Sequence, residues 1–526
     1  MSQMLKSSGA MGAATLTSRV LGMVREIVYA NFMGAGPVAS AFVLAFQIPS
    51  LFRRLLGEGA LTAAFIPVFK EKEKTAGEPE MWRAANAVIS GLTLVSVVII
   101  ALVVAGISVA LTVGVFTDKT RLMLQLLRVM FPYMLLVCIA ATYMGMLNAR
   151  GHFFIPAMGA TMLNLVMIAS VLWLAPMFGH TLETQIFGLA FGVLLAGSAQ
   201  AFFQVPVLKR EGYRFEWVRP WPNETVRLVL VRMLPGTIGV AAFQLNVVLT
   251  QSLAFWVGDS IVASFNYAVR LMELPQGVFG ISLATYLLPT LSGLAAERKY
   301  ADFRATLKQS LGYLAFVNLL ASALLVALAE PIIRLLFERG EFSAWDTHAV
   351  AWALQCLAPG LVAFSTVNIL ARAFYALGDT TTPMKVSAFC LGLNLVFVFF
   401  LVRPFEQGGL GIANTLSAVF NVGLLGYALR RKLKRLDLVE LPRVFSTVLA
   451  AALLAGLIAW LTYRGWERGL GHARLTTRLG AVFVPMGVAT AAYAAMTLAT
   501  RVPQAQDLLD LVREKLWGRR GSGLDI

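Results

Sequence analysis

Apolar stretches of twenty or more residues recur from one end of this 526-residue chain to the other. Each stretch is long enough to cross a hydrocarbon layer about 30 Å thick as an α-helix. Because that layer offers no water, the backbone must satisfy its own hydrogen bonds, and the lack of alternating apolar and polar residues argues against a barrel. Only 14% of the residues are charged, against roughly 25% in soluble domains. The sequence therefore predicts an all-α polytopic membrane protein.

The apolar stretches divide into about fourteen expected transmembrane helices. These helices are expected at residues 8–33, 37–69, 84–115, 120–148, 154–178, 184–208, 225–257, 261–292, 306–328, 346–376, 383–403, 407–430, 442–463 and 477–500. Polar loops are expected between them, and the longest lie near 70–83 and 209–227.

The net charge of +16 could indicate nucleic-acid binding, but the positions of the cations favour membrane topology instead. With the N-terminus inside, 27 of the 44 lysines and arginines fall on the cytoplasmic side and nine on the opposite side. This bias predicts that both termini are cytoplasmic, and no nucleic-acid partner is expected. The loop between the last two helices fits least well, since it carries four of the nine outer cations.

A pattern of proline, glycine and proline at helix ends occurs twice with one offset. Its members are Pro132, Gly151 and Pro156, which recur 227 residues later as Pro359, Gly378 and Pro383. A second echo relates Gly188 to Gly409, 221 residues later. Chance matching among glycine-rich helices is the alternative explanation, but the shared offset favours an internal duplication.

The duplication predicts an N-terminal six-helix lobe at 1–215 and a C-terminal six-helix lobe at 225–435, related by a parallel repeat. Residues 441–500 then form two additional C-terminal helices, and 501–526 form a cytoplasmic tail. Parallel repeats of this kind occur in secondary transporters, which hold substrate between their lobes. No polar segment is large enough to be a catalytic domain, so an enzyme is not expected.

Several charged residues lie where the chain should cross the membrane. An arginine at a helix centre costs about 2.5–3.5 kcal/mol on insertion scales, so each needs a partner, a cavity or a function. In the first helix, Arg19 and Arg25 are about 120° apart around the axis and about 9 Å apart along it, and Glu26 adds an anion. Arg19 and Arg25 are therefore expected to edge one wide cavity.

The second and eighth expected helices carry charges as well. Arg53, Arg54 and Glu58 lie between apolar flanks of the second helix, and Arg54 and Glu58 are four residues apart. Arg270 and Glu273 lie one turn apart in the eighth helix. These pairs could simply be salt bridges that fasten helices together. We expect Glu26, Arg54, Glu58 and Glu273 to act as ion-pair and gating residues.

The cations outnumber nearby carboxylates, which favours a negatively charged ligand at Arg19, Arg25 and Arg270. Guanidinium groups match phosphate oxygens in bidentate fashion and stay ionised. The four histidines are scattered without metal-ligand spacing, and no phosphate-binding loop motif occurs, so no metal, cofactor or ATP site is expected.

Four stretches carry a resemblance to a known family. They are SRVLGMVREIVYANFMGAG, AFQIPSLFRRLLGEGALTAAFIPVF, YAVRLMELPQGVFGISLATYLLPTLS and LFERGEF. With them the chain resembles the MurJ (MviN) lipid II flippases of the MATE-like MOP exporter superfamily. The resemblance implies fourteen helices, two six-helix lobes, a central cationic cavity, and a groove in the last two helices for an undecaprenyl tail.

By the same resemblance, the family's functional arginines match Arg19, Arg25, Arg53 and Arg270, and its functional glutamate matches Glu273. One departure stands out, because Ser40 occupies a position where the family usually has an aspartate. A gating scheme in which a carboxylate there pairs with a cavity arginine is therefore in doubt for this chain.

The resemblance implies a monomeric flippase in the bacterial inner membrane that moves the undecaprenyl-pyrophosphate-linked peptidoglycan precursor, lipid II, from the inner to the outer leaflet by alternating access. Its partners would be lipid II, membrane lipids and other cell-wall synthesis proteins. The alternatives are an exporter of another polyprenyl-linked glycolipid or of drugs in the same superfamily, or a membrane glycosyltransferase. A cationic-drug exporter would present an acidic cavity, and a glycosyltransferase would need a carboxylate or metal constellation.

Overall fold

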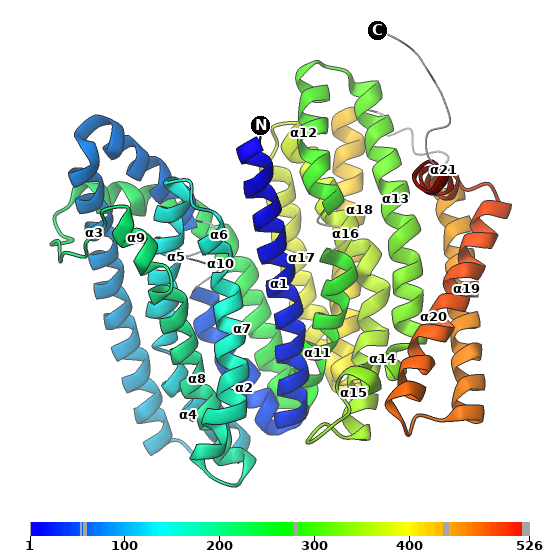
Figure 1. Cartoon of the computed structure of the whole chain (residues 1–526), viewed down its shortest axis with the longest axis horizontal. Coiled ribbons are helices and arrows are strands. Elements are labelled where there is room, and N and C mark those ends of the chain that lie inside the picture. The colour runs from blue at the N-terminus through cyan, green and yellow to red at the C-terminus, as the bar shows by residue number, and fades with distance from the viewer. Residues whose placement is uncertain (1, 53–54, 56–59, 278–281, 435–440, 518–526) are drawn as a thin grey trace. The chain divides into compact units, whose positions relative to one another are not determined.

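The structure is a computed structural model, and it describes residues 2–52, 55, 60–277, 282–434 and 441–517. Throughout these ranges the chain forms helices joined by turns and loops, and the described residues contain no β-strand (Figure 1). Contacts between residues divide the chain into two compact units. One holds residues 1–263 and 339–343, and the other holds residues 264–338 and 344–526. The expected all-α class is confirmed.

The first unit contains ten α-helices. They are α1 (Ser2–Met33), α2 (Pro37–Phe52), α3 (Ala60–Val113), α4 (Asp118–Met130), α5 (Tyr133–Ala149), α6 (Phe154–Ala157), α7 (Gly159–Ala169), α8 (Leu182–Phe202), α9 (Val205–Arg210) and α10 (Glu224–Val257). A π-helical turn and a 3₁₀ turn extend α7 to Phe178. In Figure 1, α5 lies beside α3 and α8, and contacts between these helices agree.

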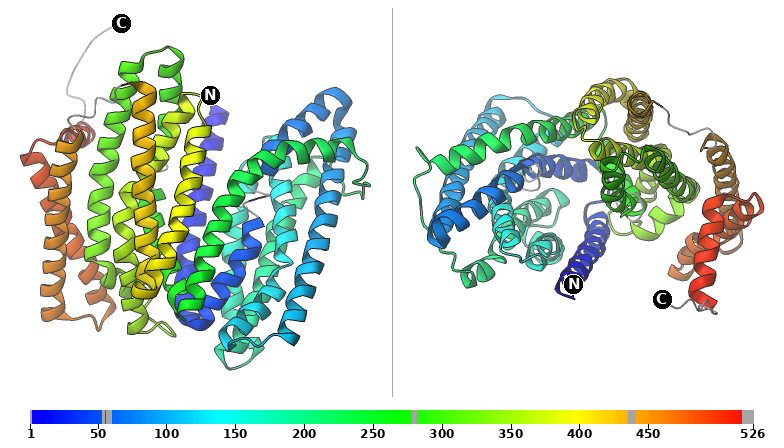
Figure 2. Two further views of the ribbon diagram at one scale, coloured as in Figure 1. Left: turned by 180° about the vertical axis from the view of Figure 1, so that it is seen from behind. Right: turned by 90° about the horizontal axis from the view of Figure 1, so that it is seen from above.

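The second unit contains most of α11 and the helices after it. They are α11 (Ile261–Pro275), α12 (Ser282–Ala296), α13 (Tyr300–Ala327), α14 (Ala329–Leu336), α15 (Ala344–Leu357), α16 (Leu361–Ala376), α17 (Thr381–Phe405), α18 (Gln407–Leu433), α19 (Leu441–Leu470), α20 (Leu475–Ala499) and α21 (Pro503–Trp517). Figure 2 shows α19 and α20, in orange and red, side by side. Both pack with α13 around an apolar core, where the Tyr493 hydroxyl donates to the Phe316 carbonyl at 2.7 Å.

Nine helical stretches among the described residues are long and apolar enough to cross a membrane. A tenth is added if α4 and α5, which bend by 42° at their junction, form one span. Shorter apolar helices cover Pro37–Phe52, Phe243–Val257 and Tyr286–Ala296. Described helices fall in all fourteen expected segments, so a multi-pass protein is confirmed, while the total of fourteen spans stays a prediction.

The expected polar loop at 70–83 is helical instead, because α3 runs through it. The helix breaks at Gly77, whose φ of 82° belongs to the left-handed region that glycine adopts readily. Lysines and glutamates have high helix propensity, and Lys70 pairs with Glu73 one turn away at 2.7 Å. A polar sequence therefore marks where this helix leaves the apolar layer rather than where it ends.

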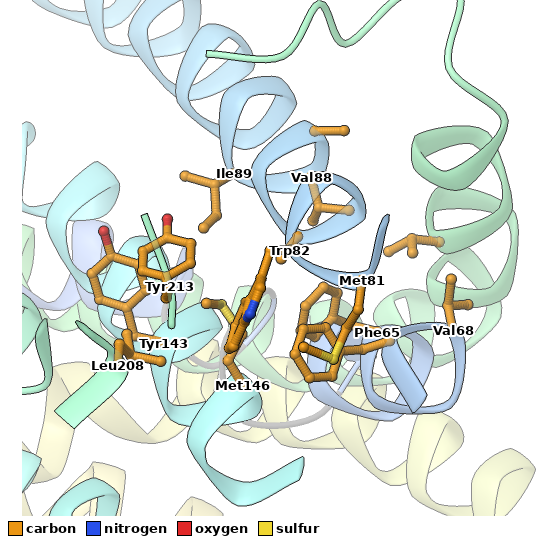
Figure 3. Packing of buried hydrophobic residues seen from close by; sticks show 14 of the residues in the cluster. Phe65, Val68, Met81, Trp82, Val88, Ile89, Tyr143, Met146, Leu208 and Tyr213 are labelled. Atoms are coloured by element: carbon orange, nitrogen blue, oxygen red, sulfur yellow. The ribbon is translucent and has the colours of Figure 1, made fainter. Parts of the chain in front are cut away.

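The core of the first unit forms where α3 and α5 meet the chain after α9. Figure 3 shows Trp82 at the centre of this cluster. Its ring lies 5.5 Å from the rings of both Phe69 and Tyr213, measured between centroids, and Tyr143 contacts Tyr213 at 5.9 Å. These aromatic contacts hold the two halves of α3 against the rest of the unit.

The two halves of the predicted duplication share a local geometry. Gly151 has φ 87° and Gly378 has φ 72°, and each follows the C-terminus of a helix. The next residue in each case donates its backbone N–H to the carbonyl five residues earlier, from His152 to Leu147 and from Asp379 to Phe374, both at 2.9 Å. This is the helix-ending motif that glycine favours. The match supports the duplication.

Packing follows a different division from the predicted repeat. The helix α10 contacts α2 and α3, so the first unit includes the helix that is expected to open the second lobe. A duplication boundary describes how the sequence repeats, whereas the units describe which residues touch. The lobes at 1–215 and 225–435 therefore stay a prediction.

Candidate functional site

Arg25 lies in the C-terminal half of α1 with its guanidinium group largely buried, since its side chain is 13% exposed. One terminal nitrogen, Nη1, donates to Asn164 Oδ1 of α7 at 3.0 Å, and the other, Nη2, contacts Glu26 Oε1 at 2.5 Å. The same group lies over the Tyr29 ring, 5.4 Å from its centroid. Asn164 also donates from Nδ2 to the Ser18 carbonyl at 3.0 Å, which fastens α7 to α1.

This arrangement leaves part of the Arg25 donor set unused. The Nε atom is buried, and no hydrogen-bond partner for it is found within the part of the chain that the structure describes. Arg19, two turns earlier, is exposed and has no acidic partner among the described residues. The part of α1 from Arg19 to its end therefore carries two cations and one anion, with one positive charge in excess.

Arg270 and Glu273 form a salt bridge near the end of α11. The Nη1 atom of Arg270 donates to Glu273 Oε2 at 2.9 Å, across one helical turn. Both side chains are accessible, at 37% and 50% exposure. An exposed pair of this kind contributes about 0.2–1 kcal/mol in water. The carboxylate can therefore be exchanged for another anion at small cost.

Three of the expected site residues, Arg53, Arg54 and Glu58, lie outside the described residues. The others fall in the first unit, as Arg19, Arg25 and Glu26 do, or in the second, as Arg270 and Glu273 do.

Ser40 is fully buried at the start of α2. Its Oγ accepts a hydrogen bond from the backbone N–H of Ala263, the third residue of α11, at 3.3 Å. The first N–H groups of a helix have no partner within that helix, so an external hydroxyl satisfies one of them. The hydroxyl here joins α2 to the first turn of α11.

A network around Arg334 of α14 was not predicted from the sequence. Arg334 donates from Nη2 to Glu330 Oε1 at 2.6 Å, from Nε to Glu338 Oε2 at 3.3 Å and from Nη1 to the Tyr463 hydroxyl at 3.2 Å. Arg478, near the start of α20, donates to the Glu338 carbonyl at 3.2 Å. The spacing of glutamate, arginine and glutamate at intervals of four was the signal that could have revealed it.

Charged side chains also tie each helix ending in the duplicated motif to a second helix. Next to Gly151, His152 and Arg150 both contact the Glu211 carboxylate at 2.8 Å, and these two contacts lower the pKa of Glu211, with His152 contributing most. Next to Gly378, Lys432 contacts Asp379 at 2.6 Å, and this contact together with hydrogen bonds from Thr382 lowers the Asp379 pKa to about 2.

These two ties would be equivalent under the predicted repeat, with reversed charge. His152 corresponds to Asp379 at the offset of 227, and Glu211 corresponds to Lys432 at the offset of 221. The anion Glu211 in the first half therefore takes the place of the cation Lys432 in the second half. A comparison of residue types alone would miss this match, because neither position keeps its side chain.

Among the described residues, no three histidine, cysteine, aspartate or glutamate side chains come together as a set of metal ligands.

The sequence model described as "Lipid II flippase MurJ" matches residues 29–472, which is most of the chain. This chain belongs to the MurJ family. Among curated MurJ relatives, "Probable lipid II flippase MurJ" of Haemophilus influenzae is 34% identical over 469 residues, covering 85% of this chain and 90% of the relative. "Lipid II flippase MurJ" of Burkholderia cenocepacia is 32% identical over 456 residues, covering 85% and 88%.

Solved structures show the same fold. The structure described as "Lipid II flippase MurJ, inward closed conformation" superposes with a TM-score of 0.76 and 20% identity, covering 93% of this chain and 99% of that one. An inward-facing multidrug resistance MATE family transporter of the MOP superfamily gives a TM-score of 0.62 at 17% identity, covering 81% and 98%. The chain therefore has the MurJ fold, and a MATE family transporter shares that fold.

Within the MurJ family, Ser40 stands where we expected an acid. Its hydroxyl binds a backbone N–H, and a hydroxyl carries no charge with which to attract an arginine. At this position the protein has a neutral hydrogen bond in place of a possible ion pair.

Proposed function

We propose that this protein translocates lipid II from the inner to the outer leaflet of the bacterial inner membrane by alternating access. The observation that carries the proposal is the match to the MurJ family over residues 29–472. The curated relatives named as lipid II flippases, which align over most of their own length, support it further.

The pyrophosphate of lipid II is bound by Arg19, Arg25 and Arg270 in this proposal. Arginine suits the task, because its planar fork matches phosphate oxygens and its charge is permanent. Support comes from the unneutralised Arg19 and from the buried Nε of Arg25, which has no partner among the described residues. Arg53 is assigned the same role from the resemblance alone.

The glutamates hold these cations until the substrate arrives. Glu26 contacts Arg25 and Glu273 contacts Arg270, so these two arginines each have an anionic partner in the absence of lipid II. A pyrophosphate brings more negative charge than one carboxylate and therefore competes for the same guanidinium groups. Exchange of partners links substrate binding to a change in helix contacts, which is what a gate requires. Arg54 and Glu58 complete the set of proposed ion-pair residues.

The undecaprenyl tail remains in lipid, held in a groove of α19 and α20. Both termini are cytoplasmic, as the distribution of cations predicts. The protein acts as a monomeric carrier and not as an enzyme. It contacts other cell-wall synthesis proteins, which supply lipid II or consume it. A membrane potential of 100 mV is worth about 2.3 kcal/mol for each charge moved, which is enough to bias such a cycle.

Depletion of the protein in its own cells tests this function against the enzyme alternative. A flippase predicts that lipid II accumulates in the inner leaflet while its total amount rises or stays level. A glycosyltransferase predicts that lipid II itself disappears. Loss of total lipid II on depletion, with no build-up on the inner leaflet, would rule out the proposal.

A further inference from the structure

Lys119, at the start of α4, reaches across the first unit to the end of α10. Its Nζ donates to the Phe255 carbonyl at 2.6 Å and to the Gly258 carbonyl at 3.2 Å, and it lies 2.8 Å from Asp259 Oδ1. It also lies 4.5 Å from the centre of the Phe255 ring. The lysine side chain is only 14% exposed, so a nearly buried cation caps the C-terminus of α10.

A cation at this end of a helix is favourable for a defined reason. The last carbonyls of a helix have no partner within it and carry partial negative charge. Lys119 satisfies two carbonyls at or next to the end of α10 at once. Asp259 contributes less, because its side chain is 74% exposed and water screens the attraction. The carbonyl contacts are therefore the part of this site that depends on Lys119.

Two further hydrogen bonds also join residues at or near the ends of helices. Ser40 of α2 accepts from the N–H of Ala263, and the Asn31 carbonyl near the end of α1 accepts from the N–H of Glu341 at 3.0 Å. Residues 339–343 belong to the first unit through such contacts, although they lie far along the chain. Gly340 has φ 57°, and a Cβ atom there would collide with the Asn31 carbonyl.

All three contacts fall on one side of the predicted membrane topology. Residues 31–40, 117–119, 255–263 and 339–343 lie at the outer ends of expected helices when the N-terminus is inside. Two of these segments come from the predicted first lobe and two from the second. We propose that these segments form an outer latch, which keeps the C-terminus of α10 against α4 and the start of α11 against α2. Lys119 is the positioning residue of this latch.

This inference rests on the proposed function for its sidedness and for its place in a transport cycle. Opening of the outer side requires α10 and α11 to leave α4 and α2, so the carbonyl contacts of Lys119 must break once in each cycle. Loss of the Lys119 charge should then raise the fraction of time for which the outer end is open.

Cysteine labelling tests the latch in the full-length protein. The native residues Cys138, Cys356 and Cys390 are replaced by alanine, and Ala263→Cys provides a fully buried reporter at the start of α11. Cells are treated from outside with a membrane-impermeant maleimide. Lys119→Met should raise the labelling rate several-fold, whereas Lys119→Arg should restore a rate near that of the reporter parent, because the charge is kept.

Two other variants separate the latch from a general loss of structure. Gly340→Ala disturbs the Asn31 contact without touching Lys119 and should raise labelling as well. Asp259→Asn removes only the exposed ion pair and should leave labelling close to the parent. Unchanged labelling in both Lys119→Met and Gly340→Ala would overturn the proposal, as would an equal rise in Lys119→Arg.

The leaflet distribution of lipid II, measured in the same cells, separates failure of the latch from failure of the proposed function. If labelling responds as predicted but the parent moves no lipid II, the latch stands and the transported substrate is a different one. If the parent moves lipid II and labelling does not respond, the function stands and the latch is wrong.

Discussion

Arg25 shows how a single buried cation is held. Its guanidinium group is divided between a neutral amide, a neighbouring carboxylate and an aromatic ring, from Asn164, Glu26 and Tyr29. Only one of these three partners carries charge. The site is therefore stabilised by hydrogen bonds and a ring face, while its buried Nε has no hydrogen-bond partner among the described residues.

The fork of Arg25 should be needed for transport, and not its charge alone. A lysine is a point charge that cannot contact Asn164 and Glu26 in the same planar arrangement. Loss of one charge-assisted hydrogen bond, worth about 1.5 kcal/mol, predicts that Arg25→Lys lowers the rate of lipid II translocation about tenfold. The rate is measured in vesicles with labelled lipid II.

Arg128→Lys is the matched control, since Arg128 is an exposed arginine of α4 whose Nη1 lies 3.5 Å from Ser108 Oγ. The translocation rate of Arg128→Lys should stay within about a factor of two of the parent rate. That difference is smaller than the loss of one weak contact would cause. Parent-like transport by Arg25→Lys would show that bidentate geometry at this residue is unimportant.

At this scale the sequence predicted contacts between near neighbours and missed distant ones. The pair of Arg270 and Glu273 follows from their spacing of three on one helix face. The bond from Arg25 to Asn164 joins residues 139 positions apart, and an asparagine in an apolar helix carries no signal of its partner. Whether two helices meet is decided by packing, which the local pattern does not contain.

Helix ends carry the clearest trace of the predicted duplication. Gly151 and Gly378 both adopt left-handed backbone angles, and neither has any atom within 4 Å of the place where a Cβ would stand. Substitution by alanine at either position therefore meets no steric neighbour. The cost is backbone strain alone, of about 1–2 kcal/mol for an L-residue in this conformation.

Gly151→Ala and Gly378→Ala should lower stability by matching amounts of about 1–2 kcal/mol. Thermal unfolding of the purified protein in detergent measures both. Gly159→Ala is the control, because Gly159 lies in helical conformation at the start of α7 with the same open space around it. It should leave stability unchanged or slightly raise it. A large difference between the two test variants would contradict equivalent roles.

Helices in apolar stretches could be predicted from the sequence, whereas the structure of charged stretches was harder to predict. Long apolar stretches became helices because a membrane leaves the backbone no alternative. The polar segment at 70–83 was expected to be a loop and is helical around the break at Gly77. Hydropathy reports which residues face lipid, and it says nothing about whether a charged stretch outside the lipid stays helical.

At the scale of the molecule, the sequence predicted the family and fold class, and the structure supplied the packing. A repeat offset of 227 residues could be read from three punctuating residues. That α10 packs with the first unit could not, because the contacts of Lys119 with the end of α10 join residues more than 130 positions apart.

The central claim is that Arg19, Arg25 and Arg270 together bind the pyrophosphate of lipid II. A leaflet-resolved assay in vesicles, with labelled lipid II and an imposed membrane potential, tests it most directly. Three lost charge-assisted contacts predict that the triple variant with alanine at these positions translocates at least a hundredfold more slowly than the parent, since each is worth about 1.5 kcal/mol or more.

The vesicles must contain equal amounts of protein with the same unfolding temperature, and Arg128→Ala should transport at close to the parent rate. Translocation by the triple alanine variant at the parent rate would contradict the account.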